Sequence, residues 1–408
     1  MRVLLITDWL RGFGGAERYI SGVRDGLREA GDEVRLLTST AGSAADGTAD
    51  YRAYGSDGFA ARAVLQIVNP FAVAALGAAR RSFRPEVVFL NMFEHQLSPA
   101  ILRPLRSVPT VLSVTDYKGV CPISSKLLPT GQLCRHRAGL VCWRSGCVSL
   151  PHWLRDRPRY ALIRSGRRHM ARVLACSRWV QRELAANGVP AEHLTLPVPD
   201  PGPAFRRAPA PEPLFVFCGR LDRIKGVALL LRAFARCRRV TPTARLRVVG
   251  EGPERPALEA LARSLGLDGA VSFRGWVSPA DVEHELADAW AQVVPSLWAE
   301  PLGLIALEAI VRGVPVIASA AGGLGEIVEH GRSGLVFPNG DEEALLQHLV
   351  AIATGATFPE HGPPEAVVRR VKEEHSPHRH IECLRRIFAS LVRGRAATTS
   401  APRSALPV

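Results

Sequence analysis

The stretch Glu300-Pro301-Leu302-Gly303-Leu304-Ile305-Ala306-Leu307-Glu308 places two carboxylates eight positions apart, the second within an otherwise apolar segment. Its leucines and isoleucines, continued by Ile310 and Val311, surround nearly the whole circumference of the helix that they predict. That helix should therefore be buried. An unpaired Glu308 in it would cost on the order of several kcal/mol. Some group must hydrogen-bond Glu308, and the hydroxyl groups of a ligand would do so.

Glycines and short apolar runs flank this stretch on both sides. An apolar strand is predicted over residues 291–296 and another over 314–319, and the pair Gly322-Gly323 follows the second strand. The same alternation of apolar strands and amphipathic helices runs through the whole chain. It is typical of α/β domains with parallel sheets covered by helices on both faces.

A proline-rich segment divides the chain into two such halves. Seven prolines fall between positions 197 and 213, as they would in an interdomain linker. A chain of 408 residues is also more typical of two domains than of one. We therefore predict domains over residues 1–198 and 214–375, joined by a linker over 199–213.

A second motif, Gly219-Arg220-Leu221-Asp222-Arg223-Ile224-Lys225-Gly226, lies between a predicted strand and a predicted helix. Its terminal glycines let the backbone approach a ligand, and Arg220 and Lys225 place two positive charges near a helix N-terminus. A bound diphosphate group requires positive charges and close backbone amides of this kind. The alternative is a solvated turn between the strand and the helix.

These motifs resemble the E-x7-E and G-R-L-x-x-x-K-G elements of the retaining nucleotide-sugar glycosyltransferases of family 4, and the resemblance covers residues 1–390. It implies the GT-B fold, in which two Rossmann-like, doubly wound domains face each other across a cleft. It also implies a C-terminal helix, here over 376–393, that crosses back to the first domain. Residues 394–408 are predicted to form a disordered tail. Without a ligand, Glu300 would be a surface carboxylate and Glu308 a core glutamate paired with an arginine.

The resemblance also implies the residues of a donor site. Glu300 would contact the donor sugar and Glu308 the ribose hydroxyls, while Gly250, Gly275 and Trp276 would belong to the wall that binds the base. Backbone amides would hold the phosphates and the sugar. The donor-binding residues implied in this way are Gly15, Gly219, Arg220, Lys225, Gly250, Gly275, Trp276, Glu300, Leu302, Gly303, Leu304, Glu308, Gly322 and Gly323.

The mechanism is inferred partly from a motif that the sequence lacks. No D-x-D pair stands at a predicted strand end to bind a divalent cation. We therefore expect no catalytic metal and no cofactor besides the nucleotide-sugar, with the charge of the leaving group stabilised by Arg220, Lys225 and backbone amides. The resemblance implies transfer with retention, by same-face attack in which the departing phosphate helps to deprotonate the acceptor.

Two N-terminal motifs bear on the acceptor. Phe13-Gly14-Gly15-Ala16-Glu17-Arg18 resembles a G-G-x-E element of the family, although Glu17 is equally explained as an acid in the first turn of a helix. The run from Thr115 to Pro122 resembles an H-D-Y-x-x-x-C-P element in which Thr115 replaces the histidine. This leaves Asp116 as the polar candidate for catalysis, together with Arg220, Lys225 and Glu300. The alternative for Asp116 is a turn at a strand end.

Four of the eight cysteines fall within an insert over residues 121–147. Cys121, Cys134, Cys142 and Cys147 would form a structural zinc site or remain unligated thiols, with His136 as a substitute ligand. Eight cysteines in a chain with no predicted signal peptide should not form disulfides. The apolar stretch over 63–79 is interrupted by polar residues and a proline, so it predicts no membrane span. We therefore expect a cytoplasmic protein.

Arginine supplies most of the net charge of +14, and the arginines cluster. Such clusters suit an anionic membrane surface or a nucleic acid, although coding bias toward arginine also explains the charge. No nucleic-acid-binding module accompanies them, so we expect a membrane-peripheral protein and no nucleic-acid partner. The clusters consist of Arg155, Arg157, Arg159, Arg164, Arg167, Arg168 and Arg172, and of Arg80, Arg81 and Arg84.

The sequence therefore predicts a retaining, metal-independent glycosyltransferase of the polysaccharide-biosynthesis type. It would move a hexosyl or pentosyl group from a nucleotide-diphosphate sugar to a hydroxyl of a glycan, a lipid-linked glycan or a small molecule. Two alternatives stay open. One is a nucleotide-sugar epimerase or hydrolase of the same fold, and the other is a catalytically silent nucleotide-sugar-binding protein, which the replacement of a histidine by Thr115 favours.

Overall fold

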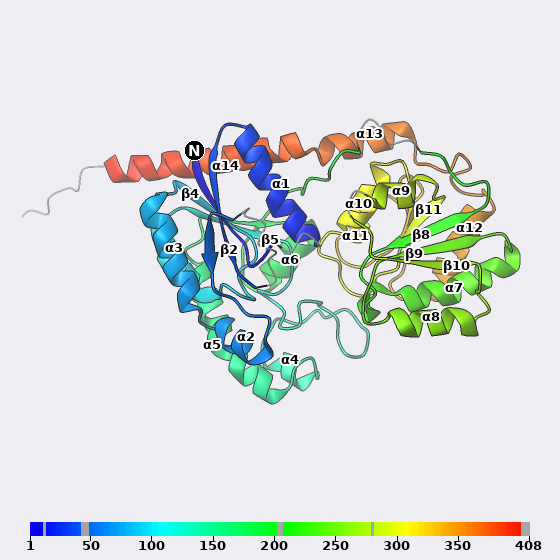
Figure 1. The fold of residues 1–408 in the computed structure, drawn as a ribbon, viewed down its shortest axis with the longest axis horizontal. Helices are drawn as coiled ribbons and strands as arrows, with labels where there is room; N and C mark the ends of the chain where they lie inside the picture. The colour runs from blue at the N-terminus through cyan, green and yellow to red at the C-terminus, as the bar shows by residue number, and fades with distance from the viewer. Residues whose placement is uncertain (11–13, 42–48, 202–206, 279–280, 401–408) are drawn as a thin grey trace, which may run out of the picture.

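The computed structural model describes residues 1–10, 14–41, 49–201, 207–278 and 281–400. It contains two parallel sheets, each flanked by helices. Figure 1 shows the sheets as two domains side by side, with the last long helix running across the top of the first domain. The two-domain α/β architecture predicted from the alternating pattern is confirmed.

Seven strands form the sheet of the N-terminal domain, in the order β3-β2-β1-β4-β5-β6-β7 with parallel pairing. Its central strands are almost entirely apolar and buried because helices cover both faces. The strands are β1 (Arg2–Ile6), β2 (Glu33–Ser39), β3 (Tyr51–Ala53), β4 (Val87–Leu90), β5 (Thr110–Val114), β6 (Arg172–Ala175) and β7 (Glu192–His193). The helices are α1 (Gly15–Glu29), α2 (Phe59–Leu65), α3 (Pro70–Ser82), α4 (Leu140–Arg144), α5 (Leu150–Arg167) and α6 (Arg178–Ala186), with short 3₁₀ turns at Pro99–Leu102 and Pro104–Ser107.

Six strands form the sheet of the C-terminal domain, in the order β10-β9-β8-β11-β12-β13, again with parallel pairing. The strands are β8 (Leu214–Cys218), β9 (Arg245–Val249), β10 (Val271–Gly275), β11 (Ala291–Val294), β12 (Val316–Ser319) and β13 (Gly334–Phe337). The helices are α7 (Val227–Val240), α8 (Arg255–Ser264), α9 (Val282–Ala287), α10 (Leu304–Ile310), α11 (Leu324–Ile327), α12 (Glu342–Ala353) and α13 (Glu365–Glu374), with a 3₁₀ turn at Arg223–Lys225.

In both sheets the strand order reverses next to the first strand of the domain. The reversal lies between β1 and β4 in the first sheet and between β8 and β11 in the second. Loops at the carboxyl ends of strands diverge at such a point and leave a crevice where ligands bind in open α/β sheets. Asp8 and Asn91 follow the first pair of strands, and Gly219 and Ser296 follow the second.

The apolar helix predicted after Pro301 is α10, and it begins at Leu304. Gly303 precedes it in the left-handed conformation, with φ of 92°, which ends the loop that carries Glu300. The helix is buried from Ala306 to Ile310, as its sequence predicts. Glu308 therefore lies inside the protein and needs a partner there.

The last helix, α14 (Pro377–Ser400), crosses from the C-terminal domain to the N-terminal domain (Figure 1). Arg385 on this helix binds Asp32 at 2.9 Å. A Cβ on Gly26 of α1 would lie 2.7 Å from Ile381, so the two helices pack closely because Gly26 has no side chain. The predicted crossover is thus present, and α14 continues to Ser400, beyond residue 393 where the prediction ended it. Residues 401–408 lie outside the described part of the chain.

The chain passes between the domains twice, and the two passages bind each other. The backbone N–H of Val198 donates to the carbonyl oxygen of His375 at 3.0 Å. The Nδ1 atom of His375 lies 2.8 Å from the carbonyl oxygen of Leu196, and Lys372 binds Asp200 at 2.9 Å. The first passage and the approach to α14 therefore run side by side.

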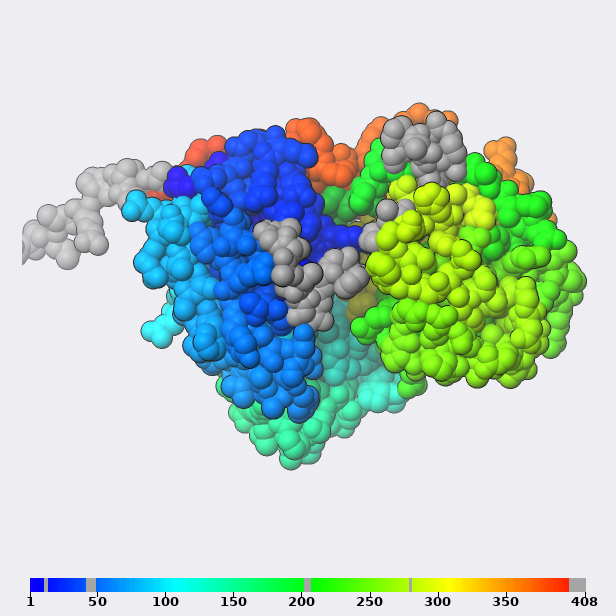
Figure 2. Space-filling model, viewed as in Figure 1, coloured from blue at the N-terminus to red at the C-terminus, as the bar shows by residue number. Residues whose placement is uncertain are grey.

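Figure 2 shows the two domains as separate lobes with a notch between them on this face. A cavity of about 100 Å³ lies where they meet, lined by residues of α1, α10 and α14. In the described residues, no single helix is long and apolar enough to cross a membrane. The pair α2 and α3 meets those criteria only jointly, across a bend of 55°.

Candidate functional site

Glu300 is held by three hydrogen-bond donors that converge on one of its carboxylate oxygens. Its Oε1 atom accepts from Nζ of Lys225 at 2.7 Å, Oγ of Ser296 at 2.6 Å and Nε1 of Trp298 at 2.8 Å. The Nζ atom of Lys225 also lies 5.3 Å from the centre of the Trp298 ring. These charge-assisted bonds offset the cost of burying the carboxylate. The structure thus brings together two predicted site residues, Lys225 and Glu300, that are 75 positions apart.

The loop after Glu300 packs directly on the loop that carries Gly322 and Gly323. The N–H of Gly323 donates to the carbonyl oxygen of Glu300 at 2.7 Å. A Cβ on Gly322 would overlap the backbone of Glu300, and one on Gly323 would lie 2.6 Å from the carbonyl oxygen of Pro301. This backbone contact explains both glycines without a ligand. It also places them beside Leu302, as the predicted site requires.

Arg220 does not join the cluster around Lys225 and Glu300. Its guanidinium pairs with Asp222, two positions along the chain, and its side chain is 73% exposed. Gly219, by contrast, lies at the carboxyl end of β8 against Gly250, so closely that a Cβ on Gly250 would overlap the carbonyl oxygen of Gly219. The structure therefore places Gly219 at the carboxyl end of β8 and leaves Arg220 at the surface.

Gly250, Gly275 and Trp276 lie together at the carboxyl ends of β9 and β10. The N–H of Gly250 donates to the carbonyl oxygen of Gly275 at 2.7 Å. Trp276 follows directly and is 54% exposed. This edge of the C-terminal sheet thus presents a large, accessible aromatic ring next to two glycines. Such a ring offers a flat apolar face to a planar ligand group.

Glu308 binds an arginine from the other domain. Its Oε1 atom lies 2.8 Å from Nη2 of Arg18, which is on α1. Gly15, in the first turn of α1, is equally close to the C-terminal domain, because a Cβ on it would lie 3.2 Å from Cδ1 of Leu304. Of the two readings left open by the sequence, the ligand-free structure shows the arginine pair. That pair joins the two domains beside the cavity described above.

Three carboxyl groups gather at the carboxyl ends of the N-terminal strands. Asp8 accepts hydrogen bonds from the backbone N–H groups of His95, Gln96 and Leu97 at 2.7–2.8 Å, yet burial raises its pKa to about 6. Burial, and then the charges of Asp116 and Asp8, raise the pKa of Glu94 to about 7. Sequence analysis singled out only Asp116 of the three.

Asp116 is half-buried at the end of β5, where its Oδ1 atom accepts from the backbone N–H of Lys118 at 2.9 Å. Burial raises its pKa above the usual range for aspartate. Thr115 donates to Oδ1 of Asn91 at 3.0 Å, so it occupies the histidine position with a structural hydrogen bond. A void of about 10 Å³, large enough for one water, lies next to Asp116, Glu94 and Arg167.

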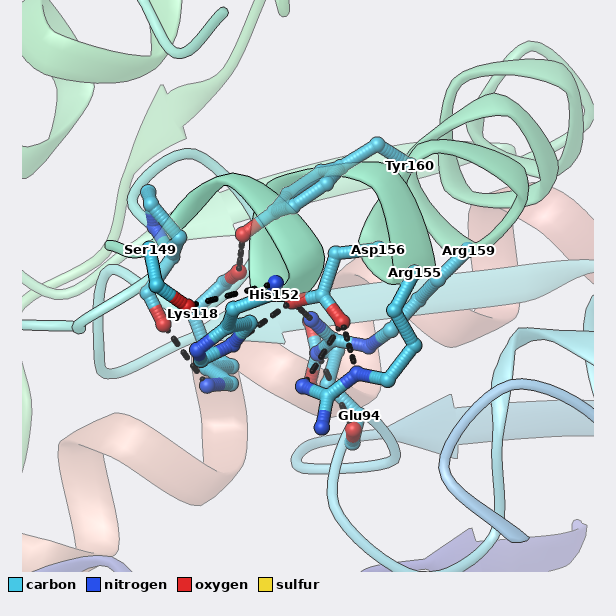
Figure 3. A network of polar contacts seen from close by, with 9 residues as sticks. Glu94, Lys118, Ser149, His152, Arg155, Asp156, Arg159 and Tyr160 are labelled. Atoms are coloured by element: carbon cyan, nitrogen blue, oxygen red, sulfur yellow. Dashed lines mark hydrogen bonds and ion pairs between the residues drawn. The ribbon is translucent and has the colours of Figure 1, made fainter. Parts of the chain in front are cut away.

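Side chains of helix α5 reach toward Glu94 and Lys118, as Figure 3 shows. Arg159 is fully buried and donates to the carbonyl oxygen of Glu94 at 3.0 Å. Tyr160 donates to the carbonyl oxygen of Lys118 at 3.4 Å, and Nζ of Lys118 donates to the carbonyl oxygen of Pro122 at 2.8 Å. The loop after Asp116 is therefore tied to α5 by side chains spaced along one helix.

A buried lysine holds the cysteine-rich insert. Lys126 binds Glu183 of α6 at 2.8 Å, and it donates to the carbonyl oxygen of His136 at 3.0 Å. Within the described ranges, no group of three or more cysteine, histidine or acidic side chains is arranged to hold a metal ion. The structure therefore does not show the predicted zinc site. Cys121, Cys134, Cys142 and Cys147 form no disulfide.

Several residues that build the site were missed by sequence analysis, and some had a usable signal. Ser296 and Trp298 directly precede Glu300 at the end of a predicted strand, where site residues concentrate. Asp8 and Glu94 follow predicted strands in the same way. Arg159 had no such signal, because nothing in the pattern distinguishes it from the other arginines of α5.

Two family profiles match adjacent parts of the chain. The profile described as "Glycosyl transferase 4-like domain" matches residues 14–199, and the one described as "Glycosyl transferases group 1" matches residues 203–356. Together they account for most of the two domains.

Curated relatives are similar over part of their length. A D-inositol 3-phosphate glycosyltransferase from Nocardioides sp. is 34% identical over 195 residues, which is 44% of this chain and 42% of that protein. A glycogen synthase from Mycobacterium tuberculosis is 38% identical over 120 residues, 29% of each chain. The chain thus matches less than half the length of these relatives.

Solved structures match the whole fold at low identity. A sucrose-phosphate synthase from Thermosynechococcus elongatus has a TM-score of 0.74 at 22% identity, covering 97% of this chain and all of the other. The Anabaena protein HepE, solved in complex with UDP, has a TM-score of 0.69 at 17% identity, covering 96% of this chain and all of that one.

Two Rossmann-like domains that face each other, joined by a returning C-terminal helix, define a protein of the GT-B fold. The chain belongs to the family-4-like glycosyltransferases, whose two domain profiles it matches in succession.

Proposed function

We propose that this chain transfers a sugar from a nucleoside-diphosphate donor to a hydroxyl group of an acceptor, with retention and without a catalytic metal. The observation that carries the proposal is the convergence of Lys225, Ser296 and Trp298 on one oxygen of Glu300. Such convergence fixes a carboxylate rigidly in a loop at the strand-order reversal, where sheets of this kind bind ligands. This chain is similar in structure to HepE, which was solved in complex with UDP. That similarity favours a uridine nucleotide as the donor's nucleotide.

The free oxygen of Glu300 has a defined part in this proposal. All three donors bind Oε1, and Oε2 accepts no hydrogen bond from the described part of the chain. Oε2 would then accept a hydrogen bond from a hydroxyl of the donor sugar. Lys225, already beside this carboxylate, would stabilise the negative charge that develops on the diphosphate as the glycosidic bond breaks.

The acceptor side would be provided by the N-terminal domain. Asp116 is the candidate base or acceptor-orienting group, because it lies at the end of β5 beside a water-sized void. In a same-face displacement the acceptor oxygen forms the new bond to the sugar as the bond to the phosphate oxygen breaks. The acceptor proton passes to the departing phosphate or to Asp116. Glycans, lipid-linked glycans and small molecules all supply suitable hydroxyl groups.

Domain closure would involve Glu308. Its present partner, Arg18, comes from the N-terminal domain, and the ribose hydroxyls of a bound donor would compete for the same carboxylate or bridge the pair. The predicted role of Arg220 in binding phosphate would require its side chain to leave Asp222. The proposal places the protein in the cytoplasm at an anionic membrane face, in keeping with its arginine clusters.

The test is a calorimetric titration of UDP-, GDP- and ADP-sugars, with and without EDTA. Wild type should bind one donor class without metal, and Glu308→Ala should weaken that binding by about tenfold or more. The matched control is Glu365→Ala on α13, whose side chain is 92% exposed and which should bind like wild type. If none of the donors binds, the proposal fails.

Product analysis separates the alternatives. NMR of the reaction should show an acceptor glycoside with the anomeric configuration of the donor. Free sugar would indicate a hydrolase and an epimerised donor would indicate an epimerase. Donor binding without turnover on a panel of acceptors would favour a silent binding protein.

A further inference from the structure

A cavity of about 1110 Å³ lies beside α5, and the function proposed above does not use it. All its lining residues fall between Gly119 and Glu192, so the cavity belongs to the N-terminal domain and is separate from the donor residues. It lies between α5 and the strands β6 and β7 at one edge of the first sheet. Its volume is at the upper end of the range for small-molecule pockets.

The lining of this cavity is strongly cationic. Among the described residues, two carboxylates line it, Asp156 and Glu192, and both already have partners. Glu192 binds Arg172 at 2.5 Å, and Asp156 binds Arg155 at 2.9 Å and Arg159 at 3.7 Å. The arginines of the lining are Arg137, Arg157, Arg164, Arg167, Arg168 and Arg172.

Five of these six arginines lack a carboxylate partner within the described ranges. One of them, Arg157, lies over the ring of Trp153 at 5.2 Å, which leaves its hydrogen-bond donors available. Like charges gathered around one cavity repel each other and attract an anion. Arg167 is half-buried, and its buried Nε atom has no hydrogen-bond partner among the described residues. Burial lowers the pKa of Arg167, and the neighbouring carboxyl groups of Glu94 and Asp116 act against this shift.

Arg167 also connects the cavity to the proposed acceptor site. Arg167, Gly119 and Val120 line both the large cavity and the small void beside Asp116. A Cβ on Gly119 would overlap Nη2 of Arg167, so the guanidinium lies directly against the loop that follows Asp116. A ligand in the cavity would therefore reach the neighbourhood of Asp116 past Arg167.

We propose that this cavity binds a phosphate or diphosphate group carried by the sugar acceptor. The assignment to an acceptor rests on the transfer proposed above, in which Asp116 marks the acceptor side. Guanidinium groups bind phosphate oxygens in pairs, and several arginines around one cavity suit a group with more than one negative charge. A phosphate with the same chemistry could also come from the headgroup of a membrane lipid, so the test separates these two sources.

The first measurement uses inorganic pyrophosphate, titrated calorimetrically into Lys225→Ala so that the donor-site lysine makes no contribution. In this background, adding Arg164→Gln and Arg168→Gln should weaken binding by about tenfold or more, and binding should fall with rising salt. The control adds Arg239→Gln and Arg263→Gln, which remove the same charge from exposed positions on α7 and α8. Equal affinity in the cavity and control variants, or no binding at all, overturns the proposal.

Vesicle sedimentation then identifies the source of the phosphate. Phosphatidylglycerol vesicles are compared with neutral phosphatidylcholine vesicles for the wild type and for the Arg164→Gln/Arg168→Gln variant. Unchanged vesicle binding by a variant that has lost pyrophosphate supports the acceptor assignment. If vesicle binding is lost in parallel and pyrophosphate competes with it, the phosphate belongs to a lipid headgroup and the acceptor assignment is wrong.

The same variant separates this inference from the proposed function. Arg164 and Arg168 are not part of the donor site, so nucleotide-sugar binding and the thermal unfolding midpoint should stay at wild-type values. Normal donor binding with unchanged pyrophosphate affinity would reject only the cavity proposal. Failure of every donor to bind the wild type would reject the transfer reaction, whatever the cavity binds.

Discussion

The hydrogen bonds to Glu300 are charge-assisted and lie partly or fully inside the protein, so each should matter more than an ordinary surface hydrogen bond. Trp298→Phe removes one donor and keeps an aromatic ring next to Lys225. We expect it to lower the free energy of unfolding by about 1.5–3 kcal/mol and to weaken donor binding. Urea unfolding and calorimetry measure the two effects.

Trp153→Phe is the matched control, because the indole of Trp153 donates to the uncharged carbonyl oxygen of Gly139 at an exposed site. Its cost should be about 0.5–1.5 kcal/mol at most, with no change in donor affinity. Equal costs for the two variants would contradict the special strength assigned to the Glu300 cluster.

The raised pKa of Glu94 predicts a stability that depends on pH. Below pH 4.5 the carboxyl is protonated in both the folded and unfolded chains. As pH rises from 4.5 to about 7, the unfolded chain ionises first, so an ionisable Glu94 increasingly destabilises the fold despite the nearby Arg167. Each unit of pKa shift corresponds to about 1.4 kcal/mol.

Glu94→Gln should therefore unfold like wild type near pH 4.5 and be more stable than wild type at pH 8, as measured by urea unfolding at both values. Glu365→Gln, at an exposed position, should show no such difference. A Glu94→Gln variant that is less stable at pH 8 would mean that the carboxylate form is the one that the fold favours.

At the scale of elements, the contact between α1 and α14 depends on the size of one residue. Gly26→Ala should force Ile381 to move and cost about 1–3 kcal/mol of unfolding free energy. Gly22→Ala, one turn earlier on the same helix, meets nothing within 4 Å and should stabilise the protein by about 0.5–1 kcal/mol. Ile381→Ala, which removes the Cγ1 atom that a Cβ on Gly26 would meet at 2.7 Å, should cost less in the Gly26→Ala variant than in wild type, as a double-mutant cycle would show.

Most elements could be predicted because their signal is local. Strands such as β8 and β12 are short apolar runs between glycines or prolines, and α10 is apolar on nearly every face. The end of α14 was missed because its Ala/Thr/Ser-rich last turns carry little apolar periodicity, which was taken to indicate disorder. The predicted zinc site is not shown, because close spacing of cysteines in sequence does not by itself arrange their sulfur atoms around one point.

At the scale of the molecule, Ser177 links the domains. Its hydroxyl donates to the carbonyl oxygen of Pro301 at 2.6 Å and also accepts from the N–H of Val180 as the N-cap of α6. Ser177→Ala should therefore cost about 1–3 kcal/mol, more than Ser149→Ala, which removes only a cap from α5. Calorimetric unfolding should also show the two domains melting less cooperatively in Ser177→Ala alone.

The site as a whole could be predicted within each domain but not between domains. Family-like motifs located Lys225 and Glu300, whose partners lie on neighbouring loops of one sheet. The pair of Arg18 and Glu308 depends on how two separate sheets are docked, and no local pattern carries that information. Sequence analysis did not predict the carboxyl cluster for a related reason. The raised pKa values of Asp8 and Glu94 come from burial, which residue type alone does not indicate.

The two chain passages between the domains lie side by side and are bonded through Val198 and His375. Two domains that are connected along one line can rotate about that line, which then acts as a hinge. The other contacts between the domains, such as Arg18 with Glu308 and Ser177 with Pro301, would then be the ones that the rotation strains. Opening for a donor should accordingly break these contacts while the bonds of His375 persist.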